Sequence, residues 1–292
     1  MGDRVYRLVV RAFCAVFVLL GLRIEIRGAE HVPEAGPAVL ACNHTSYLDF
    51  ALVGFAASRR GRLVRFLAKA STFDNPLTGP LMRAMGHVPV DRARGAAAYR
   101  RAGRELARGE VVGIFPEATI SRSWTLKPFK LGAATLAAAE GVPLVPVVVW
   151  GGHRVLTVDR RWSLRRHHPV TVLLGEPVDV PAGASVQEVD QQLRRRLDVL
   201  LDSAQRGYPD APRDDADRWW LPRRLGGTAP TPHDAAVLDA ASVAEADATA
   251  QRRRERRRGR SRRQARQAAA RRSVGRLVRR RPAVAASPPR RG

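Results

Sequence analysis

Cysteine and lysine are scarce in this sequence. Cys14 and Cys42 are the only cysteines among 292 residues, which excludes a disulfide-rich fold and any Cys-x-x-Cys metal motif. Only three of the 51 Lys and Arg residues are lysines. Two cysteines are typical of a protein in a reducing compartment, and the fold must then depend on a hydrophobic core, which 45% apolar residues can supply.

The apolar run near the N-terminus is too short to cross a bilayer. Residues 12–22 are uncharged and mostly apolar and follow Arg4, Arg7 and Arg11, whereas a transmembrane helix needs about 20 such residues. No signal-peptide cleavage site follows, because residues 23–27 resemble a strand. Two interpretations of this segment stay open: a buried core helix, or a helix lying in the membrane interface with its arginines near the headgroups.

Acidic residues are few, and the resulting charge is unevenly distributed. There are 27 Asp and Glu against 51 Lys and Arg, a net charge of +24. Residues 251–292 hold 18 arginines and one acidic residue, so they contribute +17, and the first 250 residues carry +7. We expect this low-complexity segment to be disordered alone, since like charges oppose collapse. The distribution disfavours a nucleic-acid-binding protein throughout.

Short apolar segments alternate with helical patterns along the first two hundred residues. Near-continuous apolar strands in such an alternation predict an α/β domain, a layered sheet flanked by helices. Strands are expected at 23–27, 38–42, 64–68, 111–115, 144–149 and 170–174, and helices at 48–57, 96–108, 133–140 and 186–201. Four regions follow: an apolar or interfacial helix at 1–22, the main domain at 23–208, a Pro/Gly/Trp-containing extension at 209–248 and an Arg-rich tail at 249–292.

One histidine lies where a predicted strand meets a predicted helix. Residues 38–42 lead into Asn43 and His44, and Asp49 falls in the first turn of the helix. Ligands of α/β sheets bind at the carboxyl ends of strands, and a carboxylate on one imidazole nitrogen makes the other a better base. Ser46-x-x-Asp49 also resembles a capping box, a helix start that needs no catalysis.

A second set of polar residues follows another predicted strand. Residues 111–115 lead into Pro-Glu117-x-Thr119, with Arg122 next and Lys130 just before a predicted helix. Cations beside a helix N-terminus favour phosphate binding. The alternative is an ordinary strand end with a cluster of surface charge.

A third segment, residues 86–92, resembles a short strand ending in Asp91-Arg92, which alone is more typical of a surface ion pair. In this order, the motifs resemble the conserved blocks of the phospholipid and glycerol acyltransferases, best known for the 1-acylglycerol-3-phosphate acyltransferases. The resemblance covers about residues 28–152. Four blocks carry it: Asn-His-x-x-x-x-Asp at 43–49, Gly-x-x-x-x-Asp/Asn-Arg at 86–92, Phe-Pro-Glu-Gly-Thr-Arg-Ser at 115–121 and the Val-Pro-Val run at 144–147.

The resemblance implies a glycerol-phosphate acyltransferase-like fold and transfer of a fatty acyl group to a hydroxyl of lysophosphatidate, giving phosphatidate, or to another lyso-glycerolipid. The donor would be a thioester, acyl-CoA or acyl-carrier protein, with no cofactor and no metal. His44 would be the general base and Asp49 would orient it. The residues that would bind the acceptor and its phosphate are Arg92, Glu117, Thr119, Arg122 and Lys130.

This sequence departs from the family pattern at two positions of the third block. Ala118 replaces the usual glycine, and Ile120 replaces an arginine that the family uses at the phosphate site. These departures leave open which cation binds the phosphate and which lyso-lipid is accepted. They do not affect the expected reaction type.

The sequence also bears on alternative functional classes and on where in the cell the protein acts. A serine hydrolase would need Gly-x-Ser-x-Gly, which is missing. Nucleic-acid binding as the main function is disfavoured, because it leaves the polar strand ends unexplained. The basic tail is instead expected to bind an anionic membrane surface, at the cytoplasmic face, in a peripheral or monotopic manner. Trp219-Trp220 is expected either at the bilayer interface or as a packing anchor, and His167-His168 in a solvated loop.

Overall fold

The computed structural model describes residues 2–91, 95–160, 162–181, 183–245 and 248–249. The chain divides into two compact units, Met1–Ala235 and Ala236–Gly292. The described residues of the second unit are helical. The Arg-rich tail, expected to be disordered, lies outside the described residues from position 250 onward.

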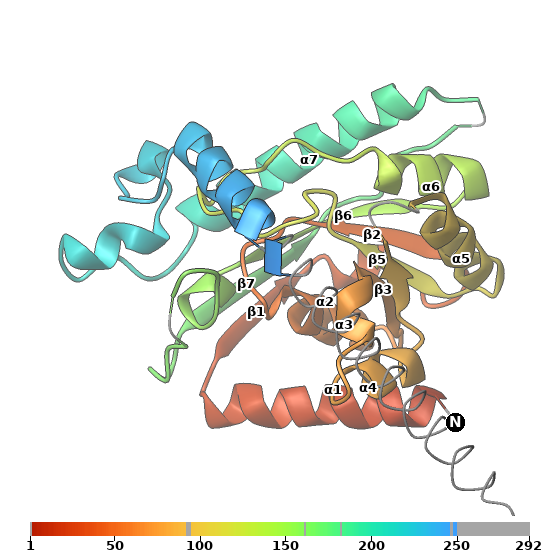
Figure 1. The fold of residues 1–292 in the computed structure, drawn as a ribbon, viewed down its shortest axis with the longest axis horizontal. Helices are drawn as coiled ribbons and strands as arrows, with labels where there is room; N and C mark the ends of the chain where they lie inside the picture. The colour runs from red at the N-terminus through yellow and green to blue at the C-terminus, as the bar shows by residue number, and fades with distance from the viewer. Residues whose placement is uncertain (1, 92–94, 161, 182, 246–247, 250–292) are drawn as a thin grey trace, which may run out of the picture. The chain divides into compact units, whose positions relative to one another are not determined.

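One seven-stranded sheet forms the centre of the first unit (Figure 1). The strand order is β1-β7-β6-β2-β5-β3-β4, and all neighbouring pairs are parallel except β6 and β7, which are antiparallel. Strands buried between helical layers need apolar side chains on both faces, which explains the continuous apolar runs of the sequence. The strands are β1 (Arg23–Arg27), β2 (Ala38–Cys42), β3 (Val64–Lys69), β4 (Val88–Val90), β5 (Val111–Ile114), β6 (Leu144–Trp150) and β7 (Pro169–Leu174).

Helices cover both faces of this sheet, with α5, α6 and α7 on one side and α1 to α4 on the other (Figure 1). Two hydrophobic cores result, and β2 contributes alternate residues to them: Val39 and Ala41 to the first, Leu40 and Cys42 to the second. The helices are α1 (Gly2–Leu19), α2 (Asp49–Ser58), α3 (Ala70–Phe73), α4 (Gly79–Ala84), α5 (Gly95–Ala107), α6 (Gly132–Glu140) and α7 (Val186–Arg206), with 3-10 turns η1 (Ala29–His31), η3 (Gly152–Arg154), η4 (Ala216–Trp220) and η5 (Arg223–Leu225).

The predicted α/β class, a layered sheet flanked by helices, is confirmed. The six predicted strands and the four predicted internal helices are present, with ends shifted by one residue in most cases, while α7 runs five residues further than expected. That last turn is kept helical by tertiary packing, because Leu201 and Ala204 are buried. The short helices α3 and α4 were not predicted, since each is too short to show a helical period.

α1 packs one face against the domain and exposes the other. Tyr6 and Phe17 are buried, and Tyr6 Oη donates a hydrogen bond to the Val64 carbonyl (2.6 Å). On the outer face, Val18 and Leu19 are 76% and 74% exposed. No helix among the described residues is long and apolar enough to span a membrane.

The first part of the predicted extension, residues 209–229 and hereafter the extension segment, packs against the main domain. Trp220 is fully buried, so the prediction that places it at the bilayer interface is wrong, and the packing-anchor alternative is confirmed. The expected solvation of His167-His168 is wrong for His168, which is buried against Ser163. Burial lowers the pKa of His168 to about 4, so the ring is neutral.

Candidate active site

The polar motifs of the sequence meet at the carboxyl edge of the parallel strands. β2 lies between β5 and β6, and all three are parallel, so the segments that follow them emerge at one edge. Three of these segments are named here: the histidine loop (43–48), the glutamate loop (115–131) and the β6 loop (151–157). Asn43 starts the first, and its side chain pairs with both backbone groups of Val149 (2.8 and 3.1 Å).

His44 and Asp49 form a hydrogen-bonded pair at this edge. The distance from His44 Nδ1 to Asp49 Oδ2 is 2.9 Å. The His44 side chain is 21% exposed and that of Asp49 is fully buried. The His44 ring stacks on Phe115, with centroids 4.3 Å apart. Because Asp49 engages Nδ1, Nε2 is the nitrogen available to accept a proton from a substrate.

Asp49 also organises the backbone of the histidine loop. Its Oδ2 accepts hydrogen bonds from the amides of Thr45 (2.7 Å) and Ser46 (2.8 Å). Burial raises the pKa of Asp49, while the bonds from His44 and the two amides favour the ionised form. One carboxylate oxygen therefore contacts the His44 ring and also holds the backbone turn that leads into α2.

Glu117 joins the histidine loop to the glutamate loop. Oε1 accepts from the backbone amide of His44 (2.9 Å), and Oε2 accepts from that of Lys127 (3.0 Å). The side chain is 4% exposed, and burial raises its pKa to about 8. Both oxygens are engaged by backbone amides, which supports a positioning role rather than the predicted contact with substrate.

The remaining predicted residues separate into different environments. Thr119 Oγ1 contacts Lys127 Nζ, so Thr119 lies beside a cation. Arg122 is tied to Asp159 by Nε (2.5 Å) and Nη2 (3.2 Å), which neutralises the charge that was expected to face phosphate. Lys130 is exposed, just before α6. Arg92 lies outside the described residues.

The two departures from the family pattern have a structural explanation. Ala118 has φ of +60°, a left-handed conformation that glycine adopts without strain, so the usual glycine fits the turn better. Ile120 is buried, 5% exposed. A position that points into the protein does not present a cation to a phosphate.

Sequence reasoning assigned no role to three residues at this edge: Phe115, Lys127 and Lys69. Phe115 stacks on the histidine, Lys127 contacts Thr119, and Lys69 is exposed at the carboxyl end of β3, which is parallel to β5. Two of them were detectable, because Phe115 ends a predicted strand and Lys69 directly follows one. The proximity of Lys127 to Thr119 depends on the path of a loop, which no periodicity records.

Comparisons with known proteins agree with this geometry. Residues 23–150 match the Acyltransferase family. A 1-acyl-sn-glycerol-3-phosphate acyltransferase of Bacillus subtilis is 29% identical over 199 residues, 64% of this chain and 95% of that protein. Chloroplastic enzymes of the same name from Brassica napus and Arabidopsis thaliana are 29% identical over 59% and 68% of this chain. The chain spans about half the length of these plant relatives, 50% and 54%.

The fold also has a solved counterpart. The crystal structure of the 1-acyl-sn-glycerophosphate (LPA) acyltransferase PlsC from Thermotoga maritima aligns with a TM-score of 0.55 and 25% identity, over 68% of this chain and 80% of that one. A largely parallel sheet with a His–Asp pair at its carboxyl edge defines an α/β protein, and the pair has the arrangement that a general base requires. The chain is therefore similar to 1-acyl-sn-glycerol-3-phosphate acyltransferases in sequence and in fold, and its residues 23–150 match the Acyltransferase family.

Proposed function

We propose that this protein is an O-acyltransferase that acylates lysophosphatidate to phosphatidate. The observation that carries the proposal is the 2.9 Å bond between His44 Nδ1 and Asp49 Oδ2, at the strand edge where the family motifs converge. The relatives bear the name of this activity. Another lyso-glycerolipid is the alternative acceptor within the same chemistry.

The geometry supports direct transfer between the two substrates. His44 Nε2 takes the proton of the acceptor hydroxyl, the oxygen attacks the thioester carbonyl, and the C–S bond breaks. The leaving thiolate receives the proton from the imidazolium. Asp49, with its two backbone donors, stabilises that imidazolium. The donor is acyl-CoA or acyl-carrier protein, and neither needs a protein-bound acyl intermediate.

Binding of the acceptor phosphate requires cations near the carboxyl edge of the sheet. Lys127 contacts Thr119, Lys130 is exposed before α6, and Lys69 is exposed after β3. These three are the only lysines of the chain. We assign the phosphate to this lysine group rather than to Arg122, because Asp159 neutralises Arg122.

The site is expected to work at a membrane surface, where its lipid acceptor resides. The outer face of α1 supports this, because Leu8 (65% exposed), Val18 and Leu19 leave apolar surface outside the core, next to Arg4 and Arg7. A helix with this distribution is typical of interfacial binding. Peripheral or monotopic attachment at the cytoplasmic face is part of the proposal.

The decisive experiment measures lysophosphatidate acylation by the purified protein and by His44→Ala, with acyl-CoA and acyl-carrier protein as alternative donors. Loss of a positioned general base lowers rates about 10²–10⁴-fold. His233→Ala, at an exposed histidine, is the matched control and retains activity. Full activity in His44→Ala contradicts the mechanism, and turnover with only one donor identifies the co-substrate.

A further inference from the structure

The β6 loop holds the backbone of the histidine loop in place. Ser46 Oγ donates to the Leu156 carbonyl (2.6 Å), and Thr157 Oγ1 donates to the Thr45 carbonyl (2.7 Å). These bonds run from the segment after β6 to the two residues that follow the catalytic histidine. The position of the histidine loop therefore depends on where the β6 loop lies.

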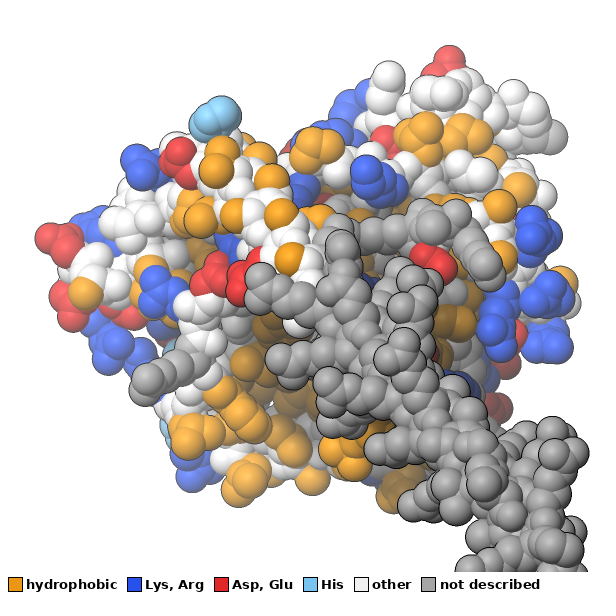
Figure 2. Space-filling view, in the orientation of Figure 1, with side chains coloured by type: hydrophobic (Ala, Val, Ile, Leu, Met, Phe, Trp, Pro, Cys, Tyr) orange, Lys and Arg blue, Asp and Glu red, His pale blue; other side chains and the backbone are white. Residues whose placement is uncertain are grey.

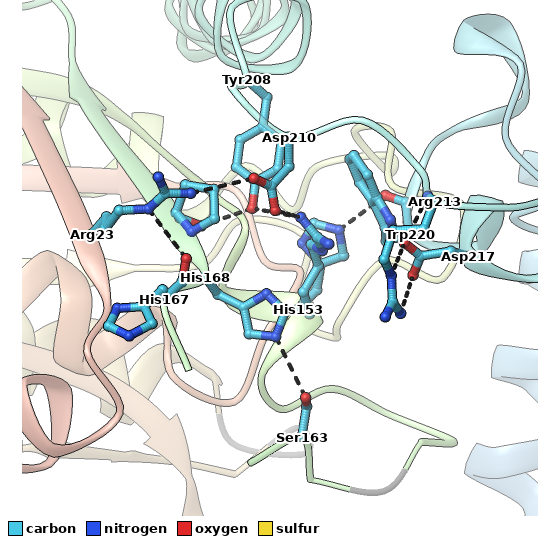
Figure 3. Close-up of polar contacts among 12 residues, drawn as sticks. Arg23, His153, Ser163, His167, His168, Tyr208, Asp210, Arg213, Asp217 and Trp220 are labelled. Carbon is cyan, nitrogen blue, oxygen red and sulfur yellow. Dashed lines mark hydrogen bonds and ion pairs between the residues drawn. The ribbon is translucent and has the colours of Figure 1, made fainter. Parts of the chain in front are cut away.

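The β6 loop is in turn held by the extension segment, as Figure 3 shows. Burial lowers the pKa of His153 to about 3, so its ring is neutral, and Nε2–H donates to the Trp220 carbonyl (3.0 Å). Arg154 Nη1 donates to Asp210 Oδ2 (2.6 Å), and its guanidinium lies 4.2 Å from the centre of the Trp220 ring. The side chain of Arg154 is 2% exposed, so the loop is fastened by a buried charge.

The same extension segment also holds the glutamate loop. Trp124 Nε1 donates to the Trp219 carbonyl (2.8 Å), and Ser121, three residues earlier, donates its amide to the His44 carbonyl (2.7 Å). Trp124 has φ of +59°, a conformation that costs a non-glycine residue free energy and persists only where contacts hold it. The adjacent carbonyls of Trp219 and Trp220 thus bind one donor from each loop beside the histidine loop.

We propose that the extension segment is a positioning element of the active site, fastened through Trp124 and the Arg154–Asp210 ion pair. It lies beyond residues 23–150, the part that matches the Acyltransferase family. By fixing the two loops on either side of the histidine loop, it sets the orientation of the His44 ring toward the reacting oxygen. The proposal rests on the proposed acyltransferase function.

A pair of matched substitutions tests this role. Trp124→Phe removes the indole donor to Trp219, whereas Trp150→Phe removes an indole N–H that has no hydrogen-bond partner in the described part of the chain. Both tryptophans are buried and lie against His153, with centroids at 4.6 and 4.4 Å. Loss of packing should therefore lower the melting temperature of the two variants to a similar extent.

The expected difference is in catalysis. Misplacement of a reacting group by about 1 Å can cost about 100-fold, so we expect Trp124→Phe to lower kcat about tenfold or more, with KM for lysophosphatidate changed little. Trp150→Phe should lower kcat by less than about threefold. Amide hydrogen exchange of residues 43–48 should accelerate in Trp124→Phe alone, and this readout needs no turnover.

Equal kcat and equal exchange in the two variants overturn the proposal. If Trp124→Phe does not fold, Asp210→Asn replaces it as the test variant, because it weakens the ion pair with Arg154. Its control is Asp215→Asn, which alters a surface ion pair with Arg218 in the same segment. An unmodified protein that lacks acyl transfer would contradict the proposed function instead. In that case hydrogen exchange still determines whether the extension segment orders the histidine loop.

Discussion

Glu117 accepts a hydrogen bond from the backbone amide of His44 at 2.9 Å, so the carboxyl group in the loop after β5 holds the backbone of the loop after β2. Its second oxygen binds the amide of Lys127. The histidine thus has two carboxyl partners, Asp49 at its ring and Glu117 at its backbone amide. Substitutions of these two residues should have different effects. Asp49 affects proton transfer by the His44 ring, whereas Glu117 affects the position of the His44 backbone.

The pKa of Glu117 makes stability depend on pH. Burial raises that pKa from 4.5 to about 8, so between these values the folded protein binds a proton that the unfolded chain has released. The free energy of unfolding should therefore fall as the pH rises from about 4.5 to about 8. Urea denaturation across this range measures the slope.

Glu117→Gln cannot titrate, so this variant should show a weaker slope. It should also be less stable by about 1–3 kcal/mol at low pH, because an amide replaces one acceptor and leaves a backbone N–H unpaired. Glu34→Gln, at an exposed ion pair with Arg60, is the control and should keep the slope of the unmodified protein. An unchanged slope in Glu117→Gln would rule out Glu117 as its source.

Asp49→Asn should leave the fold largely intact and remove most of the activity. The asparagine oxygen can still accept from the Thr45 and Ser46 amides, but a neutral group stabilises the imidazolium of His44 much less. We expect kcat to fall about 10²–10⁴-fold. Steady-state kinetics with lysophosphatidate measure this loss.

Non-additivity provides the check on that assignment. If the two residues act as a unit, His44→Ala combined with Asp49→Asn should be no slower than His44→Ala alone. Multiplicative losses in the double variant would show that Asp49 acts independently of His44. Glu176→Gln, which alters an exposed ion pair with Arg196 of α7, controls for a lost carboxylate and should leave kcat unchanged.

The sequence predicted the sheet well because its strands are buried on both faces and stand out as apolar runs between helices. His44 and Asp49 were equally predictable, since five residues separate them and both belong to one turn. The contact of Arg122 with Asp159 could not be predicted, because the two residues are 37 positions apart in the sequence. The burial of Trp220 also depends on long-range packing, which local patterns do not record.

Ala118→Gly should stabilise the protein. A left-handed backbone costs a non-glycine residue about 1–2 kcal/mol, and glycine removes this cost. The greater freedom of glycine in the unfolded chain opposes the gain by about 0.4–1 kcal/mol. The net gain in the free energy of unfolding should be up to about 1.6 kcal/mol. Ala97→Gly, at an exposed position of α5, should instead destabilise by up to about 1 kcal/mol. Equal losses in both variants would show that the turn at Ala118 is unstrained.

The outer face of α1 supplies a test of membrane attachment. Val18 is 76% exposed on α1, and Val199 is 70% exposed on α7. The two valines are therefore similarly exposed but lie on different helices, which makes Val199 a matched control. If α1 lies in the interface, Val18→Asp loses apolar contact with lipid and adds repulsion from anionic headgroups, and partitioning onto anionic liposomes should fall about tenfold. Val199→Asp should partition like the unmodified protein. Equal partitioning of both variants would mean that α1 does not contact the bilayer. Measuring partitioning at raised salt concentration would then identify binding driven by charge in other parts of the chain, because screening weakens electrostatic attraction.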